Sequence, residues 1–111
     1  MLQKKKVEIM LMSEETKELH GTVTVDKNMI YRCGPKAAIF YAEAKRQKEI
    51  RQQEGRVLDD GFFPLTLDDI KSELGFSAHE QHKIVEILTF DGALKAKRAG
   101  RLSQRHILLI K

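Results

Sequence analysis

The sequence lacks the features of several protein classes. It has one cysteine, Cys33, so no disulfide can form within the chain and nothing indicates an oxidising compartment. No apolar run approaches the length that a membrane span needs. The basic N-terminus does not lead into the apolar stretch of a signal peptide, because Glu8 and the acidic residues 14–15 interrupt it. These absences favour a cytoplasmic protein.

Acidic residues are missing from the last part of the chain. From Lys95 to Lys111 there are six basic residues and no acidic one, which leaves 14 basic and 16 acidic residues for the first 94 positions. The net charge of +4 therefore comes from the last 17 residues. A basic segment on a near-neutral body predicts a polyanionic partner. The length of 111 residues, 41% of them hydrophobic, suits one domain with a modest core.

The motifs of enzymes and of metal sites are also missing. The chain has no catalytic-triad order, no phosphate-binding loop and no glycine pattern for dinucleotides. His79 and His82 share one face of a predicted helix, and His20, Cys33 and His106 could in principle join them, but no CxxC or HExxH pattern supports a metal site. Cys33 precedes a predicted helix and is interpreted as a packed residue rather than a nucleophile. We therefore expect no enzymatic activity, no cofactor and no metal.

Two strands are predicted near the N-terminus. Residues 7–12 are apolar apart from one glutamate, and residues 20–25 alternate with β-branched side chains, before a turn at residues 26–28. We expect residues 1–32 to form a hairpin extension of a domain at residues 33–111, within one compact unit.

A long helix is predicted after Pro35, which suits the first position of a helix. It ends before Gly55, and its first half is apolar enough to be buried. Its second half, residues 45–54, has Ile50 as its one apolar residue, so it either projects into solvent or packs on a partner.

Two shorter helices have clear boundary residues. The first begins after the N-cap Thr66 and ends at Gly75. The second begins after Ser77, which opens a Ser-x-x-Glu capping box, and ends at Gly92. The buried positions expected in the second helix are Ile84, Ile87 and Leu88.

The last stretch predicts a β-hairpin. Residues 93–98 alternate, residues 99–100 supply a turn, and residues 104–110 return as a strand with an apolar end. That end is either buried under the helices or paired with the N-terminal strand. The predicted order of elements is β-β-α-α-α-β-β.

The spacing of these elements resembles that of the winged helix-turn-helix superfamily. The resemblance is carried by Ile70, Leu74, Gly75 and Ser77, then by Ile84, Leu88 and Gly92, and then by residues 95–110 as the wing. It is similar to the spacing in MarR-like regulators and in small winged-helix proteins of phages and plasmids. The resemblance implies an α+β winged helix-turn-helix fold, here with an additional N-terminal β-hairpin, and binding to double-stranded DNA.

The resemblance also implies how DNA is contacted. The second short helix would enter the major groove, and the wing would reach phosphates or the minor groove. The expected DNA-binding residues are Ser77, His79, His82, Lys83, Glu86, Lys95, Lys97, Arg98, Arg101 and Arg105. One position departs from the family pattern: Gln81 stands where a small aliphatic residue is usual. Either the helix is rotated, or Gln81 hydrogen-bonds across the turn.

These observations leave two hypotheses for function. The first is sequence-specific or semi-specific DNA binding, by a transcriptional regulator or an accessory replication or transfer protein of a mobile element. Such proteins are commonly homodimers, which would place two half-sites about one helical turn apart. The second is a protein-interaction module of the same fold that uses residues 45–53 or 79–86.

Overall fold

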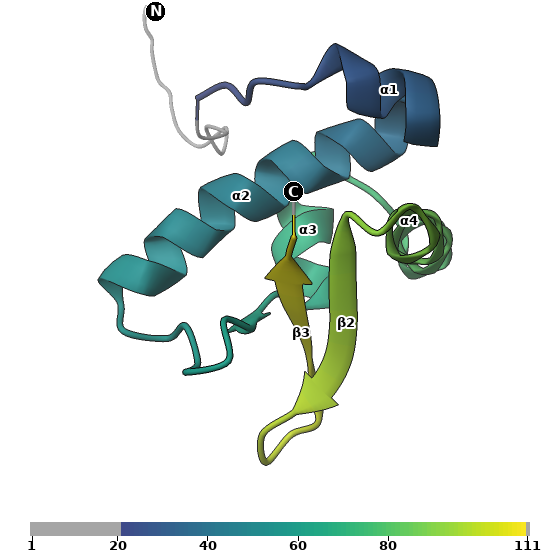
Figure 1. Ribbon diagram of the computed structural model, residues 1–111. Helices are drawn as coiled ribbons and strands as arrows, with labels where there is room; N and C mark the ends of the chain where they lie inside the picture. The colour runs from purple at the N-terminus through teal and green to yellow at the C-terminus, as the bar shows by residue number, and fades with distance from the viewer. Residues whose placement is uncertain (1–20, 111) are drawn as a thin grey trace, which may run out of the picture.

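The computed structural model describes residues 21–110, so the strand predicted at residues 7–12 lies outside the described residues. The protein is α+β, with four helices and a three-stranded antiparallel sheet in the order β1-β3-β2 among the described residues (Figure 1). The helices are α1 (Lys27–Cys33), α2 (Pro35–Gln53), α3 (Leu67–Leu74) and α4 (Ala78–Asp91), and the strands are β1 (Phe63–Pro64), β2 (Leu94–Ala99) and β3 (Gln104–Leu109). No helix within residues 21–110 is long and apolar enough to cross a bilayer.

The region before α2 differs from the prediction. Residues 21–26 form no strand, and α1 replaces the turn expected at residues 26–28. Asp26 is the N-cap of α1, and its carboxylate accepts a hydrogen bond of 2.8 Å from the backbone N–H of Asn28. The same short polar side chains favour turns and helix N-caps, so sequence pattern alone does not separate the two. Met29 enters the core from α1, and the domain boundary expected at residues 32–33 falls inside this helix.

The three predicted helices are confirmed. In α2 the first half is buried as expected, with Phe40 fully inaccessible to solvent. The α3 N-terminus is a complete capping box: the Thr66 hydroxyl accepts from Asp69 N–H, and the Asp69 carboxylate accepts from Thr66 N–H. Gly75 ends α3 in the left-handed region at φ +75°, a conformation that glycine adopts without a steric penalty.

The C-terminal hairpin is also confirmed, with β2 paired to β3 from Leu94 opposite Leu109 to Ala99 opposite Gln104. The unpredicted strand β1 pairs on the other side of β3, where buried Phe63 lies opposite buried Ile107. Strand β1 was not predicted because it has only two residues, which is too short to show alternation, and one of them is a proline, which is rare in strands. Figure 1 shows α2 crossing over the base of the sheet and the β2–β3 hairpin extending away from the helices.

Candidate nucleic-acid interface

Helix α4 presents most of the side chains expected on its outer face. His79, His82, Lys83 and Glu86 are all exposed, and Ser77 caps the helix by accepting a hydrogen bond from the backbone of Glu80. Ile87 was predicted to be buried, but it is 44% exposed. The buried face of α4 consists of Gln81, Ile84 and Leu88 instead. The polar Gln81 is therefore buried at the position where the winged-helix pattern has a small aliphatic residue.

An acidic residue in the first turn of α4 is neutralised within the chain. The Glu80 carboxylate forms an ion pair with Lys36 of α2 and also accepts a hydrogen bond from the backbone of Ser77. The bond from Lys36, and then that from Ser77, lower the pKa of Glu80. Because this carboxylate is already paired, it repels an approaching phosphate less than its sequence position suggests.

Gln81 hydrogen-bonds across the turn, which was one of the two alternatives left open by the sequence. It is fully buried, and its amide donates 3.0 Å bonds to the carbonyl oxygens of Leu67 and Phe76. Its side-chain oxygen accepts a 3.0 Å bond from Arg105 of β3. A single amide therefore joins α3, the α3–α4 turn, α4 and the sheet.

Arg105, which the sequence placed among the expected DNA-contacting residues, is buried and packs within the fold. It is 8% exposed, and its guanidinium also donates to the carbonyl oxygens of Leu65 and Thr66 at 2.6 and 3.1 Å. Burial lowers the pKa of Arg105 to about 10, so the group is still charged at neutral pH. The burial of Arg105 could have been predicted from the sequence, because Arg105 is two residues from Ile107 and therefore lies on the same face of the strand.

The other hairpin cations fall into two groups. Lys95 and Arg101 are exposed, and Arg98 donates one bond to the carbonyl oxygen of Ser103; within residues 21–110 none of the three has an acidic partner. Lys97 is held by the Asp60 carboxylate at 2.6 Å, and its ammonium lies 4.2 Å from the centre of the Phe62 ring. The bond from Lys97, followed by a backbone bond from Phe62, lowers the pKa of Asp60.

A hollow of about 330 Å³ brings α4 and the hairpin together. Its walls come from the start of α3, from α4 and from the hairpin: Thr66, Leu67, Asp68, His82, Arg98, Leu102, Ser103, Gln104 and Arg105. His82 and Arg98, which are distant in sequence and were both expected to contact DNA, therefore line one concave surface.

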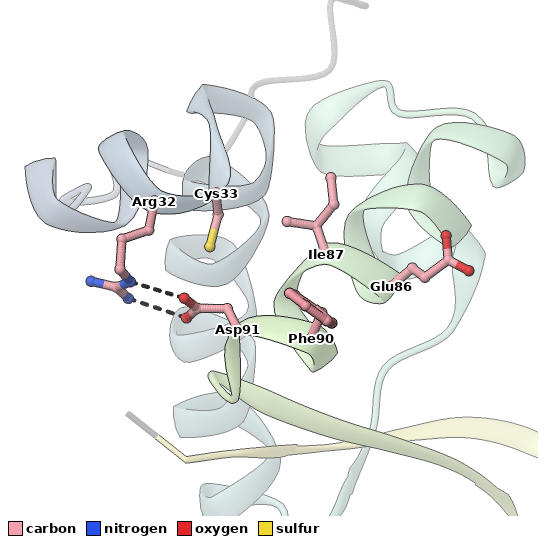
Figure 2. A pocket seen from close by; sticks show the side chains of 6 residues that line it. All are labelled: Arg32, Cys33, Glu86, Ile87, Phe90 and Asp91. Carbon is pink, nitrogen blue, oxygen red and sulfur yellow. Dashed lines mark hydrogen bonds and ion pairs between the residues drawn. The ribbon is translucent and has the colours of Figure 1, made fainter.

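A larger hollow of about 570 Å³ lies between α1 and α4, and the sequence prediction did not include it. It is lined by Arg32, Cys33, Glu86, Ile87, Phe90 and Asp91. Figure 2 shows the Arg32 guanidinium paired with the Asp91 carboxylate on one side, and Ile87 and Phe90 on α4. Phe90 is 96% exposed. Among the described residues, no group of three or more His, Cys, Asp or Glu is placed to hold a metal.

Similarity to known proteins lies in the fold alone. No protein-family model and no curated protein matches the chain. Two of the solved structures that match have a TM-score of 0.68 and 20% identity, and the match covers 82% of this chain and 75% of theirs. One is described as the structure of a Rep–DNA complex and the other as the N-terminal domain of a DNA-binding protein. The fold of this chain is therefore shared with proteins described by their binding to DNA.

Proposed function

We propose that the chain is a winged helix-turn-helix protein that binds double-stranded DNA and performs no catalysis. In this reading α3 and α4 form the helix-turn-helix, α4 is the recognition helix and the β2–β3 hairpin is the wing. The observation that carries the proposal is the concave surface shared by His82 of α4 and Arg98 of the hairpin. The fold shared with a structure described as a Rep–DNA complex supports it.

Charge at and beside this surface fits a phosphate backbone. Arg98 lines the hollow, Arg101 follows at the exposed tip of the hairpin, and neither has an acidic partner within residues 21–110. Lys95 lies on the other face of β2, because successive side chains of a strand alternate between its faces, and Lys83 lines a separate hollow beside Lys36. Phosphate contacts release condensed counterions, so binding of this kind weakens steeply as salt rises. The recognition helix has no arginine or asparagine to read guanine or adenine, so sequence preference is expected to be modest.

The biological role that fits is a transcriptional regulator or an accessory protein in replication or transfer of a mobile element. A homodimer is part of this proposal and would bind two half-sites about one helical turn apart. Selection of bound sequences from a random duplex pool tests both points, because a dimer enriches paired half-sites and a monomer enriches one.

Fluorescence anisotropy with a labelled duplex of random sequence tests DNA binding itself. We expect binding at low salt, with an affinity that falls as a power of the salt concentration. The proposal fails if the protein does not bind duplex DNA at low salt.

A second candidate function, binding to a protein, is favoured by Phe90. An aromatic ring that is 96% exposed beside a hollow is typical of a protein contact site. The expected interaction through residues 45–53 has less support, because Gln47 is buried and Arg51 is paired with Asp69 of α3. The hypothesis of protein binding is supported if the protein does not bind duplex DNA and if Phe90→Ser abolishes self-association or capture of a partner protein.

A further inference from the structure

Leu102 is the one large apolar side chain at the tip of the basic hairpin. It is 78% exposed, whereas Leu94 and Ile107 on the two strands are buried in the core. A single exposed leucine is ordinary on a protein surface. This leucine, however, follows Arg101 directly and lines the same hollow as Arg98, so the nearest charges along the hairpin are positive.

The conformation of the tip is fixed by its own backbone. Gly100 has φ +81° and Ser103 has φ +53°, the only non-glycine residue with positive φ within residues 21–110. The N–H of Ser103 donates to the carbonyl oxygen of Gly100 at 3.1 Å, and the Arg98 guanidinium donates to the carbonyl oxygen of Ser103 at 2.9 Å. A serine keeps this costly conformation only where the surroundings hold it. The turn therefore presents Leu102 in a defined direction.

That direction is the side of the hairpin that faces α4. Leu102 lines the same hollow as His82 and Arg98, the surface proposed to meet the DNA backbone. A leucine in this position gains nothing from phosphates, because it has no charge and no hydrogen-bond donor. Apolar side chains that meet DNA in this way insert at base steps in the minor groove and partly unstack them. Pyrimidine–purine steps open most easily, so they favour such insertion.

We propose that Leu102 is an apolar wedge that enters the minor groove beside Arg101 and gives the protein a preference for duplexes with an easily opened step, such as TA. This inference rests on the proposed DNA binding and adds a residue that determines specificity. Leu102 sets which sequence is deformed, whereas the neighbouring arginines supply attraction that does not depend on sequence.

The test compares Leu102→Ala with wild type on two labelled duplexes that differ only in a central TA or GC step. Affinity is measured by anisotropy, and bending by energy transfer between the duplex ends. We expect Leu102→Ala to weaken binding to the TA duplex about five- to tenfold, to weaken binding to the GC duplex less, and to reduce the bend. The dependence on salt stays unchanged, because no charge is removed.

Leu58→Ala is the matched control, since Leu58 is a leucine of the 55–62 loop that is 43% exposed. It is expected to bind and bend both duplexes as wild type does. If Leu102→Ala also behaves as wild type, the wedge is wrong while DNA binding stands. If wild type binds neither duplex, the proposed function itself fails. If Leu102→Ala binds DNA normally but loses a contact with another protein, the tip is a protein-binding element and the inference is overturned.

Discussion

The hairpin and the second half of α2 are both rich in basic residues, but they use them differently. In α2, Arg46 pairs with Glu43 of the same helix at 2.6 Å and with Glu73 of α3 at 3.7 Å, and Arg51 pairs with Asp69 of α3 at 3.3 Å. Both arginines therefore hold α2 against α3. In the hairpin, Arg98 and Arg101 have no acidic partner among the described residues. The number of cations in a segment therefore says little about phosphate binding until the acidic residues packed against them are known.

Arg105 is the buried arginine of the hairpin, and its removal is expected to have the largest effect. Arg105→Ala leaves Gln81 and the carbonyl oxygens of Leu65 and Thr66 without a buried donor. The free energy of unfolding should fall by about 3 kcal/mol, measured by urea denaturation. Arg101→Ala, at an exposed position of the same hairpin, should change it by less than about 0.5 kcal/mol. Equal stability of both variants would show that burial does not separate the two arginines.

The double variant Arg98→Ala/Arg101→Ala tests the hairpin side of the comparison. Duplex affinity should fall about tenfold or more, and the slope of log affinity against log salt should become flatter by about 1.8, which is two phosphate contacts. Circular dichroism checks that the fold is kept. An unchanged slope would mean that neither arginine meets a phosphate.

The double variant Arg46→Ala/Arg51→Ala tests the α2 side with the same change in net charge. It removes the ion pairs that join α2 to α3 and the hydrogen bond from Arg51 to the carbonyl oxygen of Pro64 in β1, so the free energy of unfolding should fall by about 1–2 kcal/mol. The salt dependence of duplex binding, measured by anisotropy under conditions where the variant is folded, should match that of wild type. A flatter slope would place these arginines on the DNA and end the contrast between the two segments.

Asp60→Asn is expected to have the smallest effect, and it tests whether the ion pair with Asp60 keeps Lys97 of the hairpin from binding phosphate. The 2.6 Å pair between Asp60 and Lys97 must break before Lys97 can meet a phosphate. Removing the carboxylate should raise duplex affinity about threefold and steepen the salt slope by about 0.9. Asp59→Asn makes the same change in net charge at an exposed neighbour with no partner within residues 21–110, and should have a smaller effect. Equal gains in both variants would point to net charge rather than to release of Lys97.

Much of the candidate interface could be predicted from local sequence pattern. Caps and stops such as Thr66, Gly75 and Ser77 act within one helical turn, so short-range sequence reports them well. The exposed positions on α4 follow from helical periodicity. Ile87 was wrongly predicted to be buried, because the buried face of the helix includes the polar Gln81, and hydrophobicity alone does not predict burial of a glutamine. The helix α1 and the strand β1 were missed, since one is short and capped by a turn-like residue and the other is two residues long.

The helices after Pro35, the hairpin and the excess of basic charge at the C-terminal end can be predicted from the chain alone, because these depend on periodicity, capping and composition. Which of the charges are available to a partner depends on how the elements pack. Arg105 hydrogen-bonds to Gln81, Lys97 to Asp60, and Lys36 to Glu80, and each pair joins residues at least 24 positions apart. Such pairings follow from how elements pack in space, and no local pattern in the chain encodes them.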